Sequence, residues 1–133
     1  MENYVHLAVL SDSLDPEEIS SQLGLSCDEA WVVGDKRVNT LLLEKENGWV
    51  LKSRVEKNAD LEDHIESVME LIKDSEHKFK AISCTKGCIV QLSYISYCES
   101  TPALNFENEV IDWLSSLGAS LDIDIYRAVG KEG

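Results

Sequence analysis

Strand-like and helix-like spacings of apolar residues alternate along the whole chain, and this order restricts the fold more than any other sequence feature. An apolar segment over residues 3–11 is typical of a strand. The segments that follow are a helix at 15–24, a hairpin at 38–55, a helix at 59–76, a hairpin at 78–99, a helix at 105–118 and a last strand from Leu121. Hairpins that alternate with helices predict an α+β fold. We expect a mostly antiparallel sheet with three helices packed on one face, a two-layer sandwich forming a single domain over residues 1–133.

Local signals place the ends of these elements. Asp15 is a good N-cap, Pro16 suits the first helical position, and Gly24 is a natural stop. Gly118 ends the third helix in the same way. The sequence "ENG" at residues 46–48 predicts the turn of the first hairpin, and Gly87 predicts the turn of the second.

Negative charge dominates the chain and is unevenly distributed. The 25 acidic residues outnumber the 12 basic ones and give a formal net charge of −13. Residues 1–35 hold eight acids and no base, and residues 87–126 hold six acids and no base. Such a chain repels nucleic-acid phosphates and anionic membrane surfaces, and it attracts basic proteins. We therefore expect a protein partner and neither a nucleic acid nor a membrane; the oligomeric state stays open.

The beginning of the chain, "MENYVHLAVLSDSLD", lacks the basic start and long apolar core of a signal peptide. We expect a cytoplasmic protein, in which the four cysteines stay reduced. Cys84 and Cys88 bracket the predicted second turn and would face each other across two strands. No pair of cysteines or histidines has the spacing of a zinc site, so the thiols are interpreted as small apolar side chains. His64 is interpreted as a surface histidine. No metal, cofactor or catalytic residue is assigned.

Asp122 and Asp124 alternate with Leu121, Ile123 and Ile125 in the last strand. The isoleucines are expected to face inward and the aspartates outward, about 7 Å apart. Two such carboxylates are able to do acid–base work or hold a cation, yet the pair is common by chance. No phosphate-binding glycine loop or nucleophile motif accompanies it, so we expect no enzyme.

The acids at the first helix, the third helix and the last strand are predicted to form one continuous negative surface, with two aromatic anchors within it. The two helices are expected to lie side by side. The predicted partner-binding residues are Asp12, Asp15, Glu17, Glu18, Trp31, Glu107, Glu109, Asp112, Asp122, Asp124 and Tyr126.

Four segments, "DPEEISSQLGL", "GWVLKS", "DLEDHIESVMELI" and "LSSLGASLDIDIY", resemble a small bacterial domain-of-unknown-function family over nearly the whole chain. The resemblance implies the fold and transfers no catalytic residue. Some members look like immunity proteins, small acidic proteins that neutralise toxins. Together with the charge, this predicts an immunity-type inhibitor of a basic bacterial toxin, for example a nuclease domain. The alternatives are a small-molecule-binding regulatory module of unknown ligand and a carboxylate-dependent enzyme.

Overall fold

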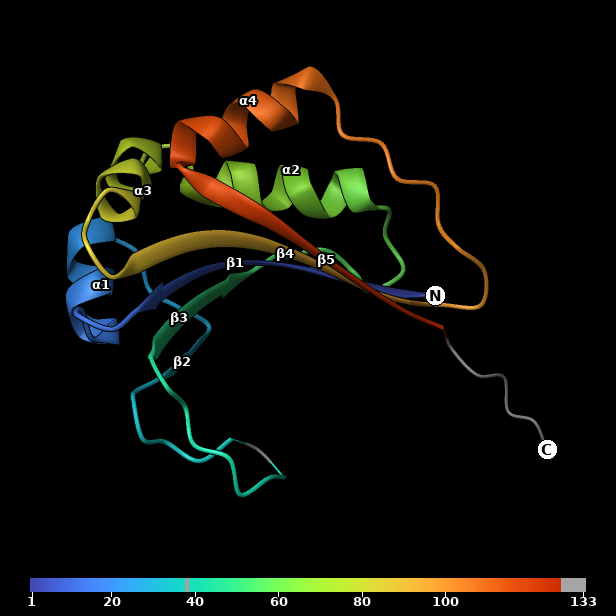
Figure 1. Ribbon diagram of the computed structural model, residues 1–133. Coiled ribbons are helices and arrows are strands. Elements are labelled where there is room, and N and C mark those ends of the chain that lie inside the picture. The colour runs from blue at the N-terminus through green and yellow to red at the C-terminus, as the bar shows by residue number, and fades with distance from the viewer. Residues whose placement is uncertain (38, 128–133) are drawn as a thin grey trace.

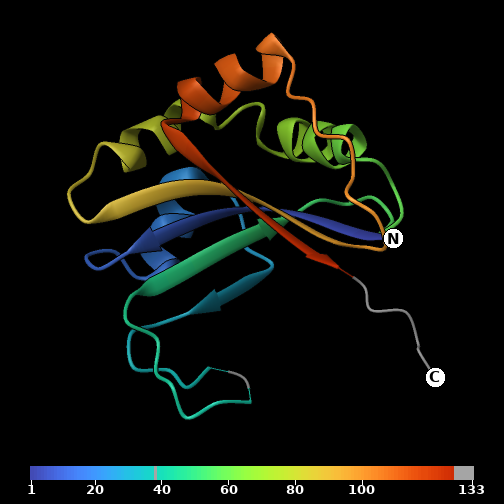
Figure 2. The same cartoon turned by 45° about the vertical axis from the view of Figure 1, so that its right-hand side comes forward.

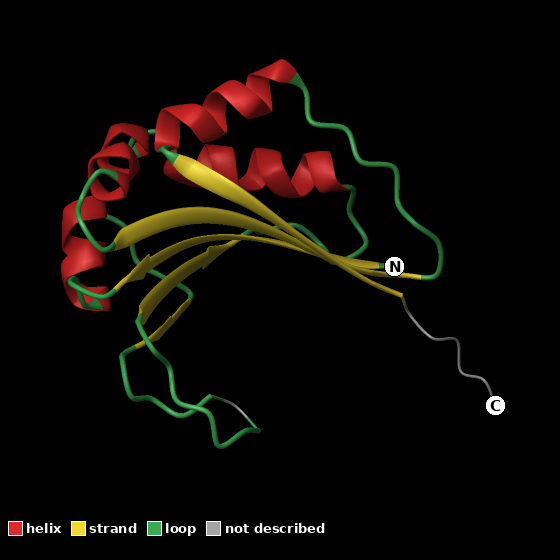
Figure 3. Cartoon of the chain, viewed as in Figure 1, coloured by secondary structure: helices red, strands yellow, loops and turns green. Residues whose placement is uncertain are grey.

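The computed structural model describes residues 1–37 and 39–127, and Figure 1 shows a curved sheet with the helices on one of its faces. The strands are β1 (Glu2–Ser11), β2 (Glu29–Trp31), β3 (Asn47–Lys52), β4 (Cys88–Cys98) and β5 (Ala119–Arg127). The helices are α1 (Pro16–Leu23), α2 (Leu61–Ile72), α3 (Glu76–Ser83) and α4 (Asn108–Leu117). Figure 3 separates the helical layer from the strand layer by colour. The predicted α+β sandwich with helices on one face is confirmed, with four helices described where three were predicted.

The strand order is β2-β3-β1-β4-β5, so the first strand of the chain is the central one. β1 pairs antiparallel with both β3 and β4, and β2 pairs antiparallel with β3. β5 instead runs parallel to β4, which makes the sheet mixed. The reason is that α4 carries the chain back along the sheet before β5 begins, and such a crossover joins parallel strands.

One face of the sheet and the helices above it form the core. Val5, Leu7 and Val9 alternate along β1 and are fully buried beneath the helical layer. Leu92 and Tyr94 on β4 continue this surface. The α2 residues Ile65, Val68 and Ile72 and the α4 residues Trp113, Leu114 and Leu117 belong to the same buried cluster. The predicted apolar stripes of these two helices are thus core residues, as their helical spacing indicated.

The predicted start of the first helix is confirmed in detail. The Asp15 carboxylate accepts a hydrogen bond from the Glu18 backbone N–H at 2.9 Å, and the Glu18 carboxylate accepts one from the Asp15 N–H at 3.1 Å. This reciprocal pair is a capping box. Gly24 ends the helix with φ 69°, and Gly118 ends α4 with φ 66°, both in the left-handed region that glycine adopts without strain.

The predicted hairpin over residues 78–99 is wrong in its first half. Residues Glu76–Ser83 form α3, and only β4 follows the turn at Gly87. The sequence "KFKAIS" alternates like a strand, but Phe79 and Ile82 also lie three apart, and both are buried on one side of a helix. As a consequence, Cys84 ends α3 and is exposed, whereas Cys88 begins β4 and is buried. The two thiols do not face each other across strands.

His64 is also placed differently from the prediction. Its side chain is only 2% exposed, and its Nδ1 lies 2.6 Å from the Ser53 hydroxyl oxygen. Burial lowers the pKa of this imidazole. His64 is therefore part of the interior beneath α2 and not a surface histidine.

The predicted turn at "ENG" is absent, because Asn47 and Gly48 open β3. Gly48 pairs with Trp31 on β2, and a Cβ added at Gly48 would overlap the Trp31 indole. The glycine is needed here for a close approach of an aromatic ring, as is typical of glycines inside strands. The chain instead turns within residues 32–46, where Lys36 bridges to Leu43; Val38, the first residue of the predicted hairpin, lies outside the described residues.

We predict that Gly48→Ala lowers the free energy of unfolding by about 1–3 kcal/mol, because the new methyl group displaces the indole. In a Trp31→Ala background the same substitution becomes neutral or stabilising, since the overlap is gone. A double-mutant cycle by urea denaturation measures this coupling. Equal effects of Gly48→Ala in both backgrounds would contradict the packing of Trp31 on Gly48.

Candidate functional site

The predicted binding residues lie in four separate places: at α1, at α4, and on the strands β2 and β5 at opposite edges of the sheet. Asp12, Asp15, Glu17 and Glu18 are at α1; Glu107, Glu109 and Asp112 are at α4; and Trp31, Asp122, Asp124 and Tyr126 are on β2 and β5. Helix α3 contacts both α1 and α4, and Figures 1 and 2 show it between them. The prediction that α1 and α4 lie side by side is wrong, because both helices were placed without knowledge of the strand order. The predicted continuous acidic surface relied on this adjacency, and α3 lies between the two helices instead.

The acids at α1 have a local role. Asp15 and Glu18 use their carboxylates in the capping box, and Glu17 adds a negative charge at the positive end of the helix. The Asp12 backbone N–H donates to the Gly87 carbonyl at 3.1 Å, which joins the end of β1 to the turn before β4. These residues stabilise the end of the sheet at which α1 lies.

The two predicted aromatic anchors lie at opposite edges of the sheet. The half-buried indole of Trp31 packs on Gly48 of β3. Tyr126 on β5 is 50% exposed and stacks on Tyr97 of β4 at 5.1 Å between ring centroids. Tyr97 in turn contacts Tyr4 of β1 edge-on at 6.2 Å. Of the two predicted anchors, only Tyr126 offers an exposed ring.

An acidic groove runs between α2 and α4, which Figures 1 and 2 show beside each other on top of the sheet. A hollow of about 120 Å³ opens between the helices, and a second of about 520 Å³ adjoins it along α2. Glu66, Met69 and Glu109 line both hollows. We use the name acidic groove for Glu62, Glu66, Glu70, Glu76, Glu107 and Glu109 together with the apolar Ile65, Met69 and Val110.

The lining of the groove is strongly negative. Six glutamates line it, and Lys73 is the one basic residue among its lining residues. The Lys73 ammonium donates to the Glu70 carboxylate at 2.8 Å, and this hydrogen bond raises the pKa of Lys73. Lys73 and Glu70 are both largely exposed, so the pair is weak in water. Five carboxylates of the lining therefore remain without a charge partner in it.

The groove floor is apolar. Ile65 is buried, and Met69 and Val110 are half-buried against the core. Val110 belongs to α4 and the other two to α2, so the floor is the seam at which these helices meet. A partner that enters the groove would cover apolar carbon below and meet carboxylates at both rims. This combination of an apolar centre and a charged rim is the usual arrangement of a protein-binding surface.

Sequence reasoning found Glu107 and Glu109 and missed the α2 side of the groove. The signal was present, because Glu62, Glu66 and Glu70 follow one another at intervals of four residues. Like charges at this spacing lie on one helix face and repel each other by about 0.2–0.5 kcal/mol per pair. The apolar stripe of α2 predicts its buried face, and the glutamates on its exposed face are not among the predicted binding residues.

Asp122 and Asp124 lie on the sheet face that carries no helix, in register with Ser93 and Ile95 of β4. The negative charge of Asp122 raises the pKa of Asp124. Within residues 1–37 and 39–127, no three histidine, cysteine or acidic side chains are grouped as metal ligands. The pair thus concentrates negative charge at one edge of the sheet.

None of the helices described reaches the length and apolarity needed to cross a bilayer, and the longest, α2, has 12 residues. Comparison with curated proteins and with solved structures gave no significant match. A family model described as a domain of unknown function, DUF4279, matches residues 1–128. This match confirms the predicted resemblance to a small family of unknown function. The chain belongs to the DUF4279 family.

Proposed function

We propose that this protein is a small acidic interaction protein that binds a basic partner protein in the groove between α2 and α4. The observation that carries the proposal is the meeting of six glutamates around an apolar floor: three from α2, Glu76 at the start of α3, and Glu107 and Glu109 at the start of α4. The partner class that fits best is a basic toxin domain, such as a nuclease, which the protein would neutralise as an immunity-type inhibitor.

The unoccupied groove carries an electrostatic cost in free energy. Carboxylates on facing helices repel one another, and that repulsion is relieved when lysine or arginine side chains enter. The gain in binding free energy is therefore larger for a basic partner than for a neutral partner of the same shape. The net charge of −13 extends the attraction beyond the groove and accelerates encounter with a positively charged protein.

A nuclease fits this surface for a further reason. An enzyme that binds nucleic acid presents lysines and arginines to a row of phosphates. The α2 glutamates recur about once per helical turn, roughly 6 Å apart along the helix axis, so they present a row of negative charges, as a nucleic-acid strand presents a row of phosphates. A groove with carboxylates on both rims therefore offers the partner's active-site cations a substitute for the nucleic-acid backbone.

We predict that an amphipathic lysine–leucine helical peptide binds the groove and shifts the amide NMR signals of α2 and α4. The triple variant Glu62→Gln, Glu66→Gln, Glu109→Gln should weaken binding at least tenfold, which is about 1.4 kcal/mol. The matched control is Glu17→Gln, Glu56→Gln, Asp112→Asn, which removes the same charge from exposed positions that do not line the groove. Equal weakening in both variants would show that only net charge matters and would contradict a groove site.

The inhibitor class is tested by identifying the genes beside this one and purifying any basic toxin domain that they encode. The protein should inhibit it at one-to-one stoichiometry, with an association rate that falls steeply as NaCl is raised. The groove variant should associate more slowly than the control variant at low salt. Full toxin activity in the presence of excess wild-type protein, or an adjacent gene that encodes no toxin, would contradict the inhibitor class while leaving the peptide result standing.

A further inference from the structure

β5 is the longer of the two edge strands of the described sheet, with nine residues against three in β2. β5 occupies one end of the strand order and pairs with β4 along Ala119–Arg127, nine residues. In the part of the chain that the structure describes, no strand pairs with its other edge. Figure 2 shows β5 beginning beside the end of α4 and running away from it. An edge of this length is a template for strand addition.

The side chains of β5 depart from the sequence prediction. Leu121, Ile123 and Ile125 are on the helix side of the sheet, yet they are 37%, 37% and 39% exposed. The isoleucines face the helix side as expected, but they are not buried in the core, because the helical layer does not extend over this edge. An apolar row therefore lies open beside backbone groups that have no strand partner. Asp122 and Asp124 form the alternate row on the face without helices.

We propose that the free edge of β5 binds an extended segment of another protein, added as a further strand, in which apolar residues alternate with lysine or arginine. Its apolar side chains would cover Leu121, Ile123 and Ile125, and its basic side chains would lie over Asp122 and Asp124. This edge is separate from the acidic groove, and the inference goes beyond the proposed function without depending on it. Main-chain hydrogen bonds give such binding its affinity, and alternate side chains give it its specificity.

The negative charges of Asp122 and Asp124 indicate which kind of chain binds the β5 edge. Cross-strand neighbours lie about 5 Å apart, so a lysine or arginine opposite either aspartate gains a close ion pair. A second copy of this chain would bring aspartates, and not basic residues, opposite these aspartates. Antiparallel pairing of two β5 strands about Ile123 places Asp122 of each copy opposite Asp124 of the other. Four carboxylates would then share one row, which disfavours a homodimer through this edge.

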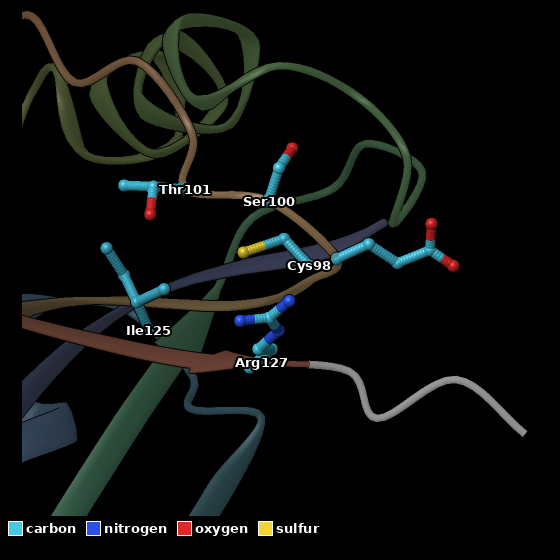
Figure 4. A pocket seen from close by; sticks show the side chains of 6 residues that line it. Cys98, Ser100, Thr101, Ile125 and Arg127 are labelled. Atoms are coloured by element: carbon cyan, nitrogen blue, oxygen red, sulfur yellow. The ribbon is translucent and has the colours of Figure 1, made fainter. Parts of the chain in front are cut away.

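The C-terminal part of the edge adds a shallow site for one side chain. A hollow of about 290 Å³ lies between β5 and the loop after β4, lined by Cys98, Glu99, Ser100, Thr101, Ile125 and Arg127. Figure 4 shows the side chains of Ile125 and Arg127 extending from β5 to the side on which Ser100 and Thr101 lie. Because Ile125 is the last member of the apolar row, the hollow continues that row. The rest of its lining is mostly polar, with Ile125 as the aliphatic member.

The test uses a blocked peptide of about seven residues in which lysine alternates with valine, titrated into the full chain. We expect slower hydrogen exchange at alternate β5 amides and a lower pKa of Asp124 in the complex, followed by NMR. Asp122→Asn with Asp124→Asn should weaken binding at least tenfold. The groove variant Glu62→Gln, Glu66→Gln, Glu109→Gln should bind this peptide as the wild type does.

Three results would overturn the inference. One is protection of amides elsewhere with none gained in β5. Another is equal peptide affinity for the wild type and the double asparagine variant, which would assign the aspartates only to keeping the edge free of aggregation. The third is a dimer in sedimentation analysis of the free wild-type chain that Ile123→Lys converts to monomer, which would assign the edge to a second copy. None of these results bears on binding in the acidic groove.

Discussion

All four described helices pack on the same face of the sheet, and this one-sided burial determines where the negative charge of the chain collects. The apolar surface of β1, β3 and β4 takes the inner stripes of the helices. α2 and α4 must then share the space above it, and their apolar residues meet at a seam that includes Ile65 and Val110. Their glutamates are left at the rims of that seam, where they face each other.

The same constraint leaves two surfaces without cover. The helical layer ends before β5 does, so Leu121, Ile123 and Ile125 stay partly exposed on the side where a core is expected. The opposite face of the sheet carries no helix, and Tyr97 and Tyr126 stack there in contact with solvent. The acidic groove and the exposed β5 row therefore both follow from burial on one face: the groove lies where two helices meet, and the row lies where the helical layer ends. Both surfaces combine exposed apolar carbon with uncompensated carboxylates.

Local signals in the sequence predicted the elements whose ends are set by single residues. Asp15 and Gly24 define α1 because capping is a local interaction, and Gly118 ends α4 for the same reason. The errors came where two local interpretations compete. Phe79 and Ile82 fit a strand or a helix, and only their burial against the core selects the helix. Gly48 follows an asparagine, but the Trp31 indole from another strand decides its conformation.

The candidate site was predicted in part, since Glu107, Glu109, Asp122 and Asp124 were named. The neighbours of these residues depend on the strand order β2-β3-β1-β4-β5, which no local pattern encodes. For this reason α4 was paired with α1, whereas the structure pairs its acids with those of α2. A search for charged stripes alongside apolar ones would have identified Glu62, Glu66 and Glu70.

The central claim is that like-charge repulsion is built into the groove, and urea unfolding at low and high salt tests it most directly. At about 20 mM NaCl, Glu66→Lys should raise the free energy of unfolding by about 0.8–2 kcal/mol, because it replaces two repulsive α2 contacts with attractive ones. This increase in the free energy of unfolding should be smaller at about 500 mM NaCl, because salt screens the charges. The control Asp112→Lys makes the same charge change outside the groove and should raise the free energy of unfolding less. An equal gain for Asp112→Lys, or a loss of stability in Glu66→Lys, would contradict the account.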